Sequence, residues 1–395
     1  MKIIQAKYWT ERLELTRPYT IAYERIDAVE NIFVRLQTED GSIGLGVAAP
    51  DAEVTGESVV DCRQALAGGL EPLVLDRDIR QLNMILRQVE NALSARPAAR
   101  AAIDIALHDL WAKYLDLPLV EVLGRCHRSL PTSITIGIKS IAESLSEAEE
   151  YRARGFRIFK IKIGQSVEQD VACLRQIRER IGSKILLRVD ANQGYAPADF
   201  NKFIDQTDSL DLEFVEQPLP AGDFANMRGL PESVRNSTAA DECLLDARNA
   251  LECLQPPRPF GIFNIKLMKC GGIAPGLQIA AIANLAGIDL MWGCMDESRV
   301  GIAAALHAAL ASPNTRYLDL DGSLDLARDL VQGGFILENG EMRVTDRPGL
   351  GVKMIADCGL RIEKPQSNLP RPCFSRLPVV RFRLLEFRLL EWIAD

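Results

Sequence analysis

Arg157-Ile-Phe-Lys-Ile-Lys-Ile163 is the first of five short apolar runs that carry a charged residue at or near their end. The others are Ile185-Leu-Leu-Arg-Val-Asp190, Leu212-Glu-Phe-Val-Glu216, Thr238-Ala-Ala-Asp241 and Gly261-Ile-Phe-Asn-Ile-Lys266. Counted from Lys162, the charged residues that close these runs are 28, 26, 25 and 25 positions apart, which is the length of one strand and one crossover helix. We therefore expect repeated strand–helix units that bring the charges into one common mouth.

The same pitch extends to eight strand-like runs, which predicts an α/β fold with a parallel (β/α) barrel resembling a TIM barrel. The competing interpretation is a doubly wound open sheet. We favour the barrel because eight regular units with polar residues at most strand ends are typical of it, and its active site lies at that face. The runs are at 132–137, 157–163, 185–190, 212–216, 237–241, 260–266, 288–293 and 316–320.

Strands followed by helices precede the barrel pattern. Residues 1–60 contain β-rich runs around the hairpin signal Glu39-Asp-Gly41, and helical patterns follow up to residue 115. We divide the chain into an N-terminal α+β domain at 1–125, a catalytic barrel domain at 126–322, a segment at 323–362 that returns to the N-terminal domain, and an atypical tail at 363–395.

The tail ends in a repeated Phe-Arg-Leu-Leu-Glu, at 382–386 and 387–391, which fits neither a helical nor a strand period. We interpret the tail as an oligomer contact or a poorly specified segment, and we expect a homo-oligomer. The net charge of −8 and a pI near 5.2 give no reason to expect nucleic-acid binding.

Cysteine usage and hydropathy indicate a cytoplasmic protein. The nine cysteines include no Cys-x-x-Cys pair, which argues against a disulfide framework or a zinc knuckle and fits a reducing compartment. No uncharged run reaches the ~20 residues of a membrane span. With only three histidines in the chain, acid–base chemistry must rely on Lys, Asp, Glu or Tyr.

Three of the charged strand ends are carboxylates on consecutive strands: Asp190, Glu216 and Asp241. Oxygen ligands from neighbouring strands suit Mg²⁺, which leaves positions for water or substrate. The alternative is three unrelated acids, but such a cluster would repel itself without a cation, and lysines flank it on both sides. We therefore predict a magnesium site.

Lys162 and Lys266 lie on the second and sixth runs, so across a barrel mouth they would face each other over the metal. One lysine could remove a proton from one face of a carbon while the other delivers a proton to the opposite face. A neighbouring Lys160 and a divalent cation should both lower the lysine pKa toward neutrality. This arrangement fits proton abstraction next to a carboxylate. Two surface lysines on an edge strand are the alternative, which the apolar context disfavours.

Five ordered motifs together resemble the enolase superfamily, in its muconate-lactonizing branch, a group that uses Lys or His bases with Mg²⁺. The resemblance covers roughly residues 1–355 and implies that the N-terminal α+β domain caps the barrel. The motifs are Lys160-Ile-Lys162, Asp190-Ala-Asn192, Glu216-Gln-Pro218, Asp241-Glu242 and Lys266-Leu-Met-Lys-Cys-Gly-Gly272.

Within that branch, Tyr317-Leu-Asp319-Leu-Asp321-Gly322 and Trp292-Gly-Cys-Met-Asp-Glu-Ser298 resemble dipeptide epimerases. The resemblance implies that Asp319 and Asp321 hold the α-ammonium of an N-terminal amino acid. It also implies that the two facing lysines exchange the α-proton of the second residue through an enolate, while Lys160 supports the substrate carboxylate. We add Thr135, on the first barrel run, to the expected substrate-binding set.

The charges expected at the mouth of the barrel bear on the choice of dipeptide. The carboxylates expected at the mouth, among them Glu24, Asp51, Glu53 and Asp296, favour a cationic dipeptide that contains Lys or Arg, although Arg25 adjoins Glu24. The alternatives are an Ala-Glu epimerase of cell-wall peptide, an N-acylamino acid racemase or o-succinylbenzoate synthase, and a catalytically dead barrel that serves as a scaffold. Substrates without a free ammonium would leave the Asp319–Asp321 pair without a partner.

Overall fold

The computed structural model describes residues 1–20 and 25–355, which belong to one compact unit. The expected contact of Glu24 and the predictions for the tail at 363–395 lie outside the described residues. Within them, no helix combines the length and the apolar character needed to cross a membrane. None of the seven cysteines that the structure describes forms a disulfide bond.

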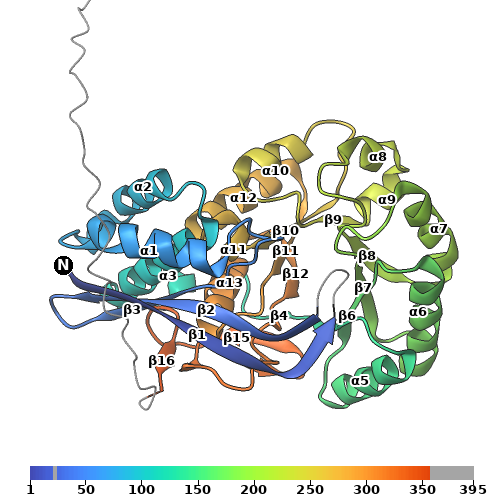
Figure 1. The fold of residues 1–395 in the computed structure, drawn as a ribbon, viewed down its shortest axis with the longest axis horizontal. Coiled ribbons are helices and arrows are strands. Elements are labelled where there is room, and N and C mark those ends of the chain that lie inside the picture. Colours follow the sequence, from blue (N-terminus) through green and yellow to red (C-terminus); the bar gives the residue numbers. More distant parts are fainter. Residues whose placement is uncertain (21–24, 356–395) are drawn as a thin grey trace, which may run out of the picture. The chain divides into compact units, whose positions relative to one another are not determined.

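An antiparallel sheet and a group of helices form the N-terminal part (Figure 1). The sheet contains β1 (Ile3–Thr20), β2 (Arg25–Thr38) and β3 (Ile43–Ala48), and the helical segments are α1 (Val59–Val74), η1 (Ile79–Gln81), α2 (Leu82–Ala92), α3 (Pro97–Tyr114) and α4 (Leu119–Leu123). Gly44 and Gly46 let β3 approach α3 closely, because a Cβ atom on Gly46 would lie 1.9 Å from the Ala102 carbonyl oxygen. This close packing buries most of α3.

The second part contains eight parallel strands in sequential order, as the pitch predicts. Thr132 and Leu318 form a parallel bridge, and Ser133 N donates to Leu318 O at 3.1 Å, so the first and last strands meet and a barrel forms. The prediction of a barrel rather than an open sheet is confirmed. The strands are β5 (Ile134–Ile136), β6 (Ile158–Lys162), β7 (Leu186–Asp190), β8 (Leu212–Glu216), β9 (Thr238–Ala240), β10 (Ile262–Lys266), β11 (Asp289–Gly293) and β12 (Thr315–Asp319).

Helices surround the barrel and are fixed by local signals in the sequence. Ser140 and Glu143 form a capping box at the start of α5, and Ser298 caps α13. Asp104 on α3 accepts from Ile273 N at 2.6 Å and so joins α12 to the N-terminal part. The helical segments are α5 (Ile141–Ala153), α6 (Val167–Ile181), α7 (Pro197–Thr207), η2 (Asp208–Leu210), α8 (Phe224–Gly229), α9 (Glu232–Asn236), α10 (Ala247–Cys253), α11 (Leu267–Cys270), α12 (Ile273–Ala286) and α13 (Arg299–Ala311).

The segment after β12 contacts the N-terminal part at several points. Thr16 N donates to Asp325 O at 2.7 Å, and Leu350 N donates to Asp109 Oδ1 at 2.8 Å. Two short antiparallel pairings complete this segment. Their strands are β13 (Val331–Gly333) with β16 (Val352–Met354), and β14 (Phe335–Glu338) with β15 (Glu341–Val344), which also pairs with β4 (Leu130–Pro131).

Candidate active site

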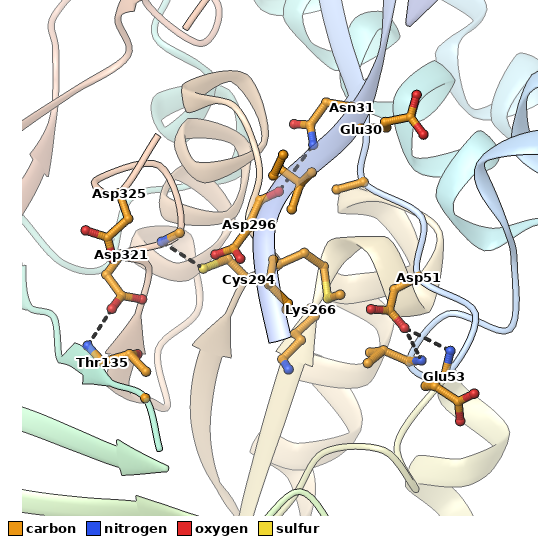
Figure 2. Close-up of a pocket in the computed structure, with 18 of the residues that line it drawn as sticks. Glu30, Asn31, Asp51, Glu53, Thr135, Lys266, Cys294, Asp296, Asp321 and Asp325 are labelled. Carbon is orange, nitrogen blue, oxygen red and sulfur yellow. Dashed lines mark hydrogen bonds between the residues drawn. The ribbon is translucent and has the colours of Figure 1, made fainter. Parts of the chain in front are cut away.

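A cavity of about 550 Å³ lies where the carboxyl ends of the barrel strands meet the N-terminal part. Lys160, Lys162 and Lys266 line it from the barrel, and Asp51 and Glu53 line it from the loop after β3. Figure 2 shows Asp51 and Glu53 on one side of the cavity and Asp321 on the other. The expected face of the barrel therefore carries a site with charged walls.

The three predicted metal ligands are brought together at the strand ends. Asp190 and Glu216 close β7 and β8 and pair in register, and Asp241 follows β9 directly. All three residues are fully buried. Taking even one unpaired carboxylate out of water costs several kcal/mol, so three in one place require cations beside them.

Lysine side chains provide those charges from both sides. Lys162 Nζ lies 2.7 Å from Asp190 Oδ2 and 2.9 Å from Asn192 Oδ1. Lys266 Nζ lies 2.7 Å from Asp241 Oδ2. Their strands, β6 and β10, are four positions apart in the eight-stranded order, so the two lysines stand across the mouth from each other.

Lys160 has three carboxylate neighbours. Its Nζ lies 2.7 Å from Asp319 Oδ2, 2.8 Å from Glu216 Oε2 and 3.0 Å from Asp190 Oδ2. It shares a face of β6 with Lys162 because alternate residues of a strand point the same way. Lys160 therefore connects the acidic cluster to Asp319 at the end of β12.

The direction of the lysine pKa shifts differs from our prediction. Burial lowers the pKa of Lys266, but the carboxylates of Asp241 and Glu216 outweigh it, and the pKa lies above its ordinary value. The same balance of burial against Asp190, Asp319 and Glu216 raises the pKa of Lys160. Lys160 does lower the pKa of Lys266, as expected, but the carboxylates outweigh it. The sequence pattern places acids and lysines in one mouth without revealing that these ammonium groups directly contact carboxylates. The lowering expected from a divalent cation stays a prediction.

The donor set of three carboxylates fits magnesium, and each carboxylate contacts a lysine ammonium group. Within the described residues, no three acidic, histidine or cysteine side chains converge closely enough to hold a metal as they stand. The carboxylates are paired with lysines instead. Burial and the neighbouring charges of Asp190 and Asp241 raise the pKa of Glu216 to about 8. The lysines therefore do not offset all of the negative charge of the three carboxylates. Carboxylate oxygens are the ligands that magnesium prefers.

Two of the residues expected to bind substrate, Asp321 and Thr135, lie on the side of the cavity opposite Asp51 and Glu53 (Figure 2). Asp321 and Thr135 both line the cavity, and the Thr135 backbone nitrogen donates to Asp321 Oδ2 at 2.6 Å (Figure 2). Asp319 also lines it, and its Oδ1 accepts from Ser133 Oγ at 2.6 Å. Two carboxylates from one strand end therefore border the same space.

Carboxylates also border the cavity near the N-terminal part. Asp296, in the loop after β11, lines the cavity and so do Asp51 and Glu53. Asp51 Oδ1 accepts from the backbone nitrogens of Glu53 and Val54 at 2.8 and 2.9 Å, which fixes this turn. The acids expected at the mouth are thus present, apart from Glu24, which lies outside the described residues.

Several residues of this region were missed by sequence reasoning. Lys269 is fully buried and contacts both the carboxylate and the carbonyl of Asp241. Its position three residues after Lys266, within one helical turn, is a signal that could have found it. Asn192 contacts Lys162, and like Lys269 it was quoted only as part of a motif, with no role assigned. Asn31, on β2, also lines the cavity, and nothing in its local sequence marks it.

Comparisons with known proteins agree with this geometry. The family model described as "Mandelate racemase / muconate lactonizing enzyme, N-terminal domain" matches residues 3–124, and "Enolase C-terminal domain-like" matches residues 143–358. The chain is 58% identical over 355 residues to the L-Lys-D/L-Arg epimerase of Desulforapulum autotrophicum, covering 90% of this chain and 100% of that protein.

More distant and structural relatives extend the picture. The L-Ala-D/L-Glu epimerase of Bacillus subtilis is 34% identical over 369 residues, with 93% of this chain and 100% of that protein covered. The dipeptide epimerase from Methylococcus capsulatus, solved with Mg and the dipeptide L-Arg-D-Lys, matches with a TM-score of 0.88 at 53% identity, covering 89% of this chain and 99% of that one. The chain belongs to the enolase superfamily, in its mandelate racemase and muconate lactonizing enzyme branch.

Proposed function

We propose that this protein is a dipeptide epimerase that inverts the second residue of cationic L,L-dipeptides containing Lys or Arg. The observation that carries the proposal is the pair Lys162 and Lys266, which face each other across the mouth with three buried carboxylates between them. Similarity to the Desulforapulum and Methylococcus proteins, whose names specify Lys and Arg dipeptides, supports the substrate class.

The mechanism assigns a role to each group of the site. One lysine, in its neutral form, takes the α-proton from one face of the second residue, and the other, as an ammonium, returns a proton to the opposite face. Asp190, Glu216 and Asp241 would hold Mg²⁺, which supplies electrostatic stabilisation of the negative charge that develops on the substrate carboxylate. Lys160, at the centre of the cluster, adds a second positive charge beside that carboxylate.

The remaining acids serve substrate binding. Asp319 and Asp321 would accept the α-ammonium of the first residue, with Thr135 fixing the position of Asp321. Asp296, Asp51 and Glu53 would face a cationic side chain of the dipeptide. Arg17 also lines the cavity, but it is 2.8 Å from Glu150 and is therefore already neutralised. Excess negative charge at the walls favours a positive ligand.

The competing functions lack comparable support. An N-acylamino acid racemase or an o-succinylbenzoate synthase would leave Asp319 and Asp321 without a cationic partner. An Ala-Glu epimerase would need a positive group for the glutamate side chain, where Asp296 and Asp51 present negative ones. A dead scaffold would not need both lysines and all three acids in place. Self-association and a cytoplasmic location stay predictions.

Proton exchange in D₂O with Mg²⁺ tests the proposal. NMR would follow loss of the second residue's α-proton and formation of the L,D epimer in a dipeptide set with L-Lys-L-Arg, L-Ala-L-Glu and hydrophobic pairs. We expect exchange and epimerisation to be fastest for the cationic members. Preference for L-Ala-L-Glu would replace the substrate class, and absence of exchange on every dipeptide would point to N-acylamino acids or succinylbenzoate chemistry.

A further inference from the structure

Asn31 is a fully buried polar residue at the start of an apolar stretch of β2, directly after the exposed Glu30. Its neighbours Ile32, Phe33 and Val34 are also fully buried, so the local pattern gives no reason for an amide. A buried amide whose hydrogen bonds are not made costs roughly 1–3 kcal/mol. An amide side chain at this position therefore needs hydrogen-bond partners.

Those partners belong to the loop between β11 and α13. Asn31 Nδ2 donates to the carbonyl oxygen of Asp296 at 3.2 Å, and Asn31 Oδ1 accepts from the backbone nitrogen of Ser298 at 2.8 Å. Figure 2 shows the first of these bonds crossing from β2 to the loop. The carboxamide imitates a peptide group and pairs with the loop as a neighbouring strand would. Residues separated by about 265 positions in sequence are thus joined.

On the loop side of this contact, Ser298 makes further hydrogen bonds to α13 and to the segment after β12. Ser298 Oγ accepts from Val300 N at 3.3 Å as the cap of α13 and donates to Asp329 Oδ1 at 2.8 Å. Ser298 is therefore fixed independently of Asn31. Asp296, two residues earlier, accepts the bond from Asn31 through its carbonyl oxygen, so Asn31 contacts the backbone of the residue whose carboxylate lines the cavity.

We propose that Asn31 is a positioning residue that sets the preference for cationic dipeptides by fixing the backbone of Asp296. The inference rests on the proposed function, in which the Asp296 carboxylate faces a cationic side chain. Both Asn31 and Asp296 line the cavity. The attraction between two charges falls as their separation grows, so a loop released from Asn31 loses selectivity for charge. The reacting groups stand on barrel strands and do not depend on this bond.

The test compares Asn31→Leu with the wild type on L-Lys-L-Arg and on L-Ala-L-Ala. Leucine has a similar branched shape, although it is larger, and it makes neither hydrogen bond. We expect KM for L-Lys-L-Arg to rise about tenfold while kcat changes less than about twofold, and both constants for L-Ala-L-Ala to stay close to wild type. The double variant with Asn31→Leu and Asp296→Asn should have nearly the same KM for L-Lys-L-Arg as Asp296→Asn alone, because both substitutions weaken the same interaction.

Two further variants separate positioning from general stability. Thr38→Val removes the hydrogen bond from the buried Thr38 Oγ1 to the exposed Asp40 Oδ1 at 2.6 Å, at the far end of the same strand. It should lower the melting temperature without altering the ratio of kcat/KM between the two dipeptides. Asn31→Gln keeps both hydrogen-bonding groups on a side chain one methylene longer, and should show the same selective loss if leucine prevents folding.

Three results carry different meanings. A folded Asn31 variant that keeps the wild-type ratio of kcat/KM, or lowers kcat/KM equally for both dipeptides, overturns the positioning role while leaving the proposed function intact. A wild-type enzyme that shows no preference for L-Lys-L-Arg overturns the proposed substrate class, and this inference with it. A selective rise in KM for L-Lys-L-Arg in Asn31→Leu or Asn31→Gln, absent from Thr38→Val, supports it.

Discussion

Lys160 on β6 and Asp319 on β12 form an ion pair of 2.7 Å that joins the acidic cluster to the wall expected to bind the substrate ammonium. Asp319 is thus occupied on both oxygens, by Lys160 and by Ser133, whereas the Asp321 carboxylate accepts from Thr135. The two acids of the same motif are therefore not equivalent.

This difference predicts different kinetic effects for the two acids. Asp321→Asn should raise KM for L-Lys-L-Arg by about tenfold or more with little change in kcat, because it weakens binding that is equal in the ground and transition states. Asp319→Asn should lower kcat as well, because Lys160 loses a charged partner and shifts. Steady-state kinetics of both variants provide the check. Equal effects on KM alone would show that the Lys160 contact has no part in catalysis.

The facing lysines predict complementary losses. Lys162→Met and Lys266→Met should each reduce epimerisation by at least about a thousandfold, since removing one base leaves one face of the α-carbon without proton transfer. Each variant should still exchange the α-proton of one epimer with D₂O, and the two variants should retain opposite epimers. NMR on L,L and L,D dipeptides separately provides the measurement. Loss of the same epimer in both variants would contradict a two-base mechanism.

Metal removal should affect stability as well as activity. Chelation by EDTA is expected to abolish epimerisation, and Mg²⁺ should restore it. Because magnesium would bind the folded site alone, the melting temperature should rise with Mg²⁺ concentration. Glu216→Gln should lose most of that rise, yet be no less stable than the wild type without metal, since it removes one of three mutually repelling carboxylates. Glu232→Gln, at a surface helix, is the matched control and should retain the full response.

Features that repeat at a regular spacing could be predicted from the sequence, whereas contacts between residues far apart in the chain could not. The pitch from Lys162 to Lys266 was enough to predict the barrel, because each charge follows a strand of fixed length. It could not show that Lys160 reaches Asp319, 159 residues away, since that contact requires the barrel to close. Asn31 was missed for the same reason, as its partners belong to another part of the chain. The lysine pKa shifts depended on distances of under 3 Å, which no residue pattern provides.

His307 predicts an acid-labile component of stability that is unrelated to the site. It is fully buried on α13, where its Nδ1 accepts from Val120 N at 2.9 Å and joins α13 to α4. Burial lowers the pKa of His307 to about 3. The folded pKa lies below the unfolded value near 6.5, so the unfolded state takes up the proton more readily. Stability is therefore complete above pH 6.5 and falls as the pH drops toward 3, by about 2 kcal/mol at pH 5.

Urea unfolding at pH 7.5 and pH 5.0 provides the measurement for His307. His307→Gln offers Val120 a neutral acceptor that does not titrate, so its loss of stability between the two pH values should be smaller than that of the wild type by about 2 kcal/mol. His127→Gln, at a partly exposed histidine, is the control and should lose as much as the wild type. The same loss in His307→Gln and wild type would mean that His307 is not the group whose protonation opposes folding, and that the acid sensitivity arises from the buried carboxylates instead.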